Sequence, residues 1–168
     1  MTLPGDEFPD PASAASAFTL PLRVYWEDTD AGGVVYYANY LKFCERARTE
    51  WLRSLGLEQQ RLADAEGLLF VVGSADLRFL RPARLDDRLL VDVAVASRGG
   101  ASLDLVQRVW RDGQSPTLLA RARVLVACVQ AGSLRPRRLP RALLQALDAL
   151  AQPGGASRGA TPGDAQAQ

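Results

Sequence analysis

The chain has 168 residues, of which 48% are hydrophobic and 23% are charged, values that suit one globular domain with a sizeable core. Its formal net charge of +1 argues against a nucleic-acid-binding protein. The sequence contains no histidine, which excludes a histidine triad, a histidine general base and a histidine-ligated metal site. No metal and no cofactor are expected.

The two cysteines, Cys44 and Cys128, form neither a CxxC pair nor a zinc-binding pattern. Cys44 falls on the apolar face of a predicted helix and Cys128 in an apolar strand, so we expect buried thiols and a reducing compartment. No run approaches the roughly 18 apolar residues of a membrane span, and the acidic N-terminal segment does not resemble a secretory signal. We therefore expect a cytoplasmic protein without a membrane span.

Residues 1–19 are rich in Pro, Ala and Ser and are expected to form a flexible tail. A strand is predicted over residues 20–27, and a glycine turn follows it. The next segment is predicted to be a long helix with Asn39 as its N-cap and Gly56 as its stop. Its apolar residues recur every three or four positions: Tyr40, Cys44, Ala47, Trp51 and Leu55. Residues 57–66 are predicted to form a second, short helix.

From Gly67 onward the pattern changes to one typical of strands, which are predicted over residues 68–80, 88–97, 102–111 and 118–129. The run 124–129 is apolar on both faces, which favours a central strand covered on both sides. A short amphipathic helix is predicted over 141–151, before a low-complexity tail, 152–168, that we expect to be disordered. One long helix against antiparallel strands predicts an α+β domain over residues 20–140.

The candidate catalytic residues lie in the segment 23–51, RVYWEDTDAGGVVYYANYLKFCERARTEW. The carboxylates of Asp28 and Asp30 come at the end of the predicted strand. Gly32 and Gly33 permit a sharp turn and close approach of a ligand, and the following helix offers free amides at its N-terminus. This arrangement suits carbonyl chemistry, in which the carboxylate acts as nucleophile or base and the amides receive negative charge.

The segment YWEDTDAGGVVYYANYLKFCERARTEWLRSLG closely resembles the signature of the YbgC-like branch of the 4-hydroxybenzoyl-CoA thioesterase family. The resemblance continues through RPARLDD at 81–87 and RARVLVACV at 121–129, and it covers residues 20–140. It implies the hotdog fold, in which a five-stranded antiparallel sheet wraps around a long central helix. It also implies dimers joined edge to edge, often paired into tetramers, whose interfacial active sites take an acyl-CoA or an acyl carrier protein.

The resemblance also assigns roles to residues. The second aspartate of the DTD element, Asp30, is implied to be the catalytic carboxylate, and the backbone N–H of Tyr37 is implied to contact the oxyanion. The thioester end of the pocket is implied to be lined by Gly33, Val34, Val35 and Tyr36. Many YbgC-like relatives have histidine where this chain has Tyr37, a departure that bears on substrate preference and rate more than on reaction class.

Two classes of function stay open. The first is an acyl-CoA thioesterase; the second is a hotdog binding or scaffold protein with weak or no hydrolysis, associated with the cell-envelope Tol-Pal system or with lipid synthesis. A hotdog dehydratase is disfavoured because such enzymes usually use a catalytic histidine.

On the long helix, Glu45 is expected to pair with Arg48 at the surface. Three loop arginines, which could meet CoA phosphates, are more often solvated: Arg81, Arg84 and Arg88.

Overall fold

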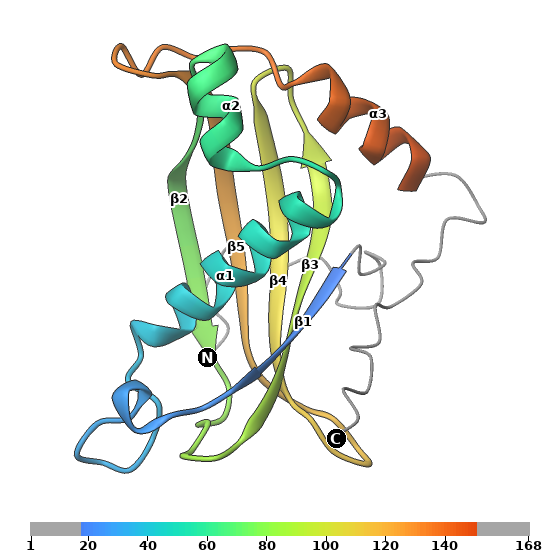
Figure 1. Cartoon of the computed structure of the whole chain (residues 1–168). Coiled ribbons are helices and arrows are strands. Elements are labelled where there is room, and N and C mark those ends of the chain that lie inside the picture. The colour runs from blue at the N-terminus through green and yellow to red at the C-terminus, as the bar shows by residue number, and fades with distance from the viewer. Residues whose placement is uncertain (1–17, 151–168) are drawn as a thin grey trace, which may run out of the picture.

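The structure, a computed structural model, describes residues 18–150. Both predicted tails lie outside these residues, apart from residues 18 and 19, which belong to the first strand. Figure 1 shows the elements, which in chain order are β1 (Phe18–Arg23), the 3-10 turn η1 (Trp26–Asp28), α1 (Asn39–Ser54), α2 (Gln59–Glu66), β2 (Leu68–Phe79), β3 (Arg88–Arg98), β4 (Ser102–Arg111), β5 (Thr117–Gln130) and α3 (Arg141–Leu150). None of the helices in this part of the chain is long and apolar enough to cross a membrane.

The described strands form one antiparallel sheet of five strands in the order β1-β3-β4-β5-β2. The helix α1 lies across one face of this sheet, and α2 leads from its end to the edge strand β2 (Figure 1). The predicted α+β architecture, with a sheet around a long central helix, is confirmed. The long edge of β2 pairs with no strand of the described residues.

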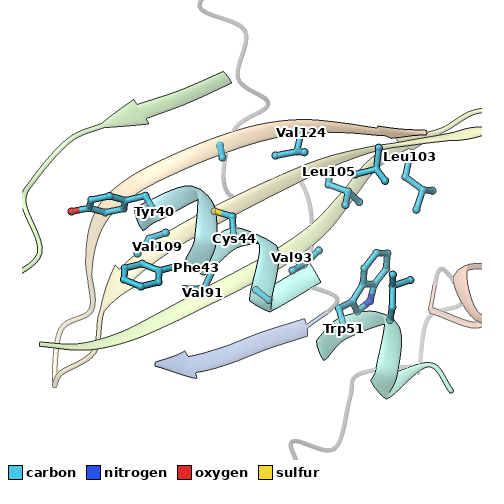
Figure 2. Close-up of a cluster of buried hydrophobic side chains, with 14 of the residues drawn as sticks. Tyr40, Phe43, Cys44, Trp51, Val91, Val93, Leu103, Leu105, Val109 and Val124 are labelled. Atoms are coloured by element: carbon cyan, nitrogen blue, oxygen red, sulfur yellow. The ribbon is translucent and has the colours of Figure 1, made fainter. Parts of the chain in front are cut away.

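The core lies between α1 and the sheet. The helix buries the face that its periodicity predicts, and Phe43 lies with it, fully buried. Alternate residues of a strand point to one face of a sheet, and the facing strands supply the other half of the core seen in Figure 2: Val91, Val93, Leu103, Leu105, Val109 and Val124. This packing fixes the position of the helix N-terminus relative to the sheet.

The start of α1 differs from the prediction. The helix begins at Asn39, and its N-cap is Ala38, so the assignment of Asn39 as the N-cap is wrong. The Asn39 side chain instead donates from Nδ2 to the carbonyl oxygen of Asp28 at 3.0 Å, which ties the helix to the turn before it. At the other end, Gly56 has a φ of +77° and follows the last helical turn, so the predicted stop is confirmed.

Both cysteines are free and buried, as predicted. Burial raises the pKa of the Cys44 thiol to about 12. Burial also raises the pKa of Cys128. Because the thiolate is the reactive form of cysteine, both side chains act here as small apolar packing groups.

Candidate active site

The segment between β1 and α1 begins with a buried carboxylate. The strand β1 ends at Arg23, earlier than predicted, because Trp26–Asp28 form the turn η1. The side chain of Asp28 is buried, and its Oδ2 accepts a hydrogen bond from the Tyr25 N–H at 2.9 Å. Its carbonyl oxygen accepts the bond from Asn39. Asp28 therefore has a structural role, since it holds the strand end, the turn and the helix start together.

A tight turn follows, and it presents the second aspartate. Thr29 and Val35 pair in an isolated antiparallel bridge that closes the turn. Inside it, the Asp30 N–H donates to the Val34 carbonyl at 3.0 Å, and the Gly33 N–H donates to the Asp30 carbonyl at 2.9 Å. Gly33 has a φ of +69°, a conformation that glycine adopts without a Cβ penalty.

The carboxylate of Asp30 is exposed and oriented by one backbone amide. Its Oδ1 accepts a hydrogen bond from the Gly32 N–H at 2.8 Å. No other group of the described residues donates to this carboxylate, so Oδ2 is open to a ligand. Within residues 18–150, no cluster of three or more cysteine, aspartate or glutamate side chains could hold a metal ion.

The helix start next to this turn carries an open amide. The Tyr36 N–H donates to the Asp28 carbonyl at 2.8 Å, and the Asn39 N–H donates to the Tyr36 carbonyl at 2.9 Å, whereas the Tyr37 N–H has no acceptor among the described residues. The rings of Tyr36 and Tyr37 lie 4.6 Å apart between centroids. The pKa of Tyr36 is raised, mainly by its hydrogen bond with Tyr37 and to a smaller extent by the charge of Asp30.

Three of the four residues expected to line the thioester end lie at or near the surface. Gly33 and Tyr36 are exposed and Val34 is half-buried. The side chain of Val35, by contrast, is buried in the hydrophobic core. The turn thus brings Asp30, Gly33 and Tyr36 together at the surface, while Val35 anchors them from below.

The loop after β2 holds this turn against α1. The Val35 N–H donates to the Ala83 carbonyl at 2.8 Å, and the Ala83 N–H donates to the Tyr40 hydroxyl oxygen at 2.9 Å. Both partners in the second bond are buried. The three arginines of this loop and the following strand start are all exposed, as expected: Arg81, Arg84 and Arg88.

A second feature was missed by sequence reasoning. A cavity of about 110 Å³, called here the α1 cavity, lies between the C-terminal half of α1, the start of α2 and strands β2, β4 and β5. It is lined by Glu45, Arg48, Thr49, Trp51, Leu52, Gln59, Phe70, Val72, Leu103, Leu105 and Val126. Its signal in the sequence is Arg48, a charged residue four positions after Cys44 and three before Trp51, beside the buried face.

The predicted ion pair on this part of the helix is wrong. Glu45 accepts a hydrogen bond from the Thr49 hydroxyl at 2.7 Å through Oε1. Arg48 donates from Nη1 to Oε1 of Gln107 on β4 at 2.8 Å. Gln107 is fully buried, and its Nε2 donates to the Cys44 carbonyl at 2.9 Å. A buried amide acceptor across the core thus replaces the expected partner one helical turn away.

Comparisons with known proteins place this geometry in a family. The family model of the Thioesterase-like superfamily matches residues 24–147. The acyl-CoA thioesterase YbgC of Haemophilus influenzae is 45% identical over 126 residues, which are 75% of this chain and 90% of the relative. The acyl-CoA thioester hydrolase YbgC of Escherichia coli is 47% identical over 127 residues, which are 76% of this chain and 92% of that protein.

A solved structure of a thioesterase supports the same family assignment. The crystal structure of a 1,4-dihydroxy-2-naphthoyl-CoA thioesterase from Synechocystis matches with a TM-score of 0.74 at 29% identity and covers 81% of this chain and 98% of its own. The family match spans the turn, α1, the whole of β2 to β5 and most of α3. The chain therefore belongs to the Thioesterase-like superfamily, as a thioester hydrolase of the YbgC-like branch with the hotdog fold.

Proposed function

We propose that the protein hydrolyses acyl-CoA thioesters to a carboxylic acid and CoA, with Asp30 as its catalytic carboxylate. The observation that carries the proposal is the exposed Asp30 carboxylate, held by the Gly32 amide beside a helix start whose Tyr37 N–H has no acceptor among the described residues. The YbgC relatives are acyl-CoA thioesterases, which supports acyl-CoA thioesters as the substrate class.

Two routes fit a carboxylate in this position. Asp30 could attack the thioester carbonyl, so that CoA leaves as thiolate and water then hydrolyses the mixed anhydride. Alternatively, Asp30 could take a proton from water as the hydroxide forms its bond to the carbonyl carbon, and CoA leaves when the tetrahedral intermediate collapses. Both routes place negative charge on the carbonyl oxygen.

The proposed acceptor of that charge is the Tyr37 N–H, aided by the partial positive charge at the start of α1. This role uses the backbone, so it does not depend on a histidine at this position. We propose that the thioester end of the substrate lies along the turn and the helix start, next to Gly33, Val34 and Tyr36, with the Val35 side chain in the core beneath them.

Gly32→Ala is expected to lower kcat/KM about tenfold with little change in thermal stability. A Cβ at this position would lie 3.0 Å from Oδ1 of Asp30, so the carboxylate must shift by a few tenths of an ångström. A displacement of about 1 Å can cost about a hundredfold in rate, so a smaller shift costs less. Gly100→Ala, where an added Cβ meets nothing within 4 Å, is the matched control and should keep the wild-type rate. Equal rates for the two variants would contradict the positioning of Asp30 by this turn.

Thiol release from a panel of thioesters tests the function itself. The panel holds short, long and aromatic acyl-CoAs and the same acyl groups on an acyl carrier protein. Release from at least one acyl-CoA supports the proposal and gives the acyl class. Release from the carrier protein alone would reassign the substrate, and no release from any member would favour the binding or scaffold function.

We also propose that two copies pair along the free edge of β2. This edge is 12 residues long and unpaired among the described strands, and an open edge of this kind readily pairs with another strand. Val72 and Phe79 on this strand are about half exposed, so a second copy could bury apolar surface here. Sedimentation equilibrium should give a multiple of the 18.2 kDa chain mass. A fully active monomer would contradict the pairing.

A further inference from the structure

The α1 cavity has one apolar wall and one polar wall. The apolar wall consists of Leu52, Phe70, Val72, Leu103, Leu105 and Val126, and the polar wall consists of Glu45, Arg48, Thr49 and Gln59. The carboxylate mechanism at Asp30 uses none of these residues. Phe70 and Val72 come from β2, so the cavity lies beside the free edge of the sheet.

The polar wall has unused hydrogen-bonding capacity. A guanidinium has five N–H donors, and that of Arg48, which is half-buried, makes one hydrogen bond within the described residues, to Gln107. Burial lowers the pKa of Arg48, and the nearby Glu45 carboxylate opposes this effect in part. Glu45 uses only Oε1, on the Thr49 hydroxyl. Trp51 also lines the cavity, and its buried Nε1 has no acceptor in the described part of the chain.

A hydroxyl group matches this wall better than other chain ends. It both accepts and donates a hydrogen bond, so it can accept from Arg48 and donate to Glu45. A carboxylate would be attracted by Arg48 but repelled by Glu45, which has no donor to offer it. An alkyl end would displace water from the guanidinium without replacing its acceptor. The volume of about 110 Å³ is below the ~150 Å³ of a protein cavity known to bind benzene, which favours an aliphatic group over an aromatic ring.

We propose that the α1 cavity receives the far end of the acyl group and that Arg48 and Glu45 select aliphatic acyl chains with a hydroxyl at that end. This inference rests on the proposed thioesterase function and narrows its substrate class. Arg48 and Glu45 would act as specificity residues, because they contact the chain end and not the reacting carbonyl.

The pairing proposed for β2 explains how one substrate could reach both places. In one copy, Arg48 lies about 14 Å along the helix from Asn39, at about 1.5 Å per residue. Phe79 at the end of β2 contacts Tyr40 near the start of α1, with ring centroids 5.3 Å apart, whereas Phe70 near the start of β2 lines the cavity. Antiparallel pairing of two β2 strands sets the end of one beside the start of the other. It would bring the catalytic turn of one copy toward the α1 cavity of its partner.

The test compares matched substrates across chain length. For each length from butyryl-CoA to decanoyl-CoA, kcat/KM is measured for the unsubstituted, the ω-hydroxy and the ω-carboxy acyl-CoA, with 4-hydroxybenzoyl-CoA as the aromatic member. The variants are Arg48→Met, Arg48→Lys and Glu45→Leu, and Arg46→Met is the control because Arg46 is exposed and does not line the cavity. Glu45 is exposed too, so its replacement should not impair folding if Arg48→Met does.

At the length that reaches the cavity, the ω-hydroxy substrate should exceed the other two aliphatic forms and the aromatic member at least about tenfold, as a hydrogen bond to a charged group allows. Arg48→Met and Glu45→Leu should each abolish this preference, so that the hydroxylated and the unsubstituted chain of that length react at equal rates. Arg48→Lys should keep part of it, and Arg46→Met all of it. Equal rates for hydroxylated and plain chains at every length would overturn the inference, as would a preference that survives in both Arg48→Met and Glu45→Leu.

A binding measurement separates this inference from the proposed function. The free ω-hydroxy acids and their plain counterparts are titrated into the wild type and Arg48→Met by calorimetry. Tighter binding of the hydroxy acid that is lost in the variant would support the cavity assignment even if no thioester were hydrolysed. Absence of any binding difference in the wild type would count against it even if hydrolysis were fast.

Discussion

Asp30→Asn is expected to lower kcat/KM for the best acyl-CoA at least about a hundredfold, which corresponds to about 2.7 kcal/mol of transition-state stabilisation. Asparagine keeps the shape of the side chain and an oxygen that can accept the Gly32 N–H, a bond of 2.8 Å in the structure. It is, however, neither a nucleophile nor a base at the carbonyl. Thiol release from wild type and variant, measured side by side, checks the prediction, with circular dichroism and sedimentation to verify the fold and the oligomer.

The matched control for this change is Glu27→Gln. Glu27 is exposed on the neighbouring turn η1, and its replacement removes the same charge from the same region of the surface. The control should keep the wild-type rate because Glu27 has no proposed role at the carbonyl. If Asp30→Asn were as active as Glu27→Gln, the Asp30 mechanism would be wrong, and a hotdog binding or scaffold function would gain support.

Phe43→Ala is expected to reduce the free energy of unfolding by about 3–5 kcal/mol, the usual cost of removing a buried phenylalanine ring. Phe43 is fully buried on α1 and packs beside Tyr40, with ring centroids 6.1 Å apart, in the core drawn in Figure 2. The deletion leaves a cavity at the helix–sheet interface, which the packed strands can only partly fill. Equilibrium unfolding in urea, with the midpoint and slope fitted separately, measures the loss.

Leu41→Ala provides the comparison on the same helix. Leu41 is 41% exposed, so its truncation removes little buried area and should cost at most about 1 kcal/mol. Similar losses for the two variants would mean that the buried face of α1 is assigned wrongly. The difference between them therefore tests the packing of the central helix, independently of any enzymatic activity.

Local patterns accounted for most of the secondary structure. The three- and four-residue spacing of Tyr40, Cys44, Ala47 and Trp51 predicted the buried face of α1, and all four are buried. Alternation predicted the four strands after Gly67 with ends close to those observed. These predictions succeed because a helix or strand that covers a core must repeat apolar residues with its own geometric period.

The predictions that failed concern partners. Arg48 was expected to pair with Glu45, one turn away, but it binds Gln107, which is 59 positions further along the chain. Asn39 was expected to cap its own helix, but it binds Asp28 across the turn. In both cases a contact made by folding outweighed the local rule. The strand β5 is an interior strand of the sheet, as predicted, and Leu125 is 41% exposed in the single chain, so its cover by another subunit stays a prediction.

By itself, the sequence determined the helices and strands, the DTDAGG turn before the helix and the family. Each of these depends on residues that are close together along the chain. Only the tertiary structure decided that Asp28 is buried while Asp30 is exposed, that the Tyr37 amide has no acceptor in the described part of the chain, and that a polar-walled cavity lies beneath α1. Burial and hydrogen-bond partners depend on which distant strands fold against a residue. Periodicity records which face of an element is turned inward, but not what it meets there.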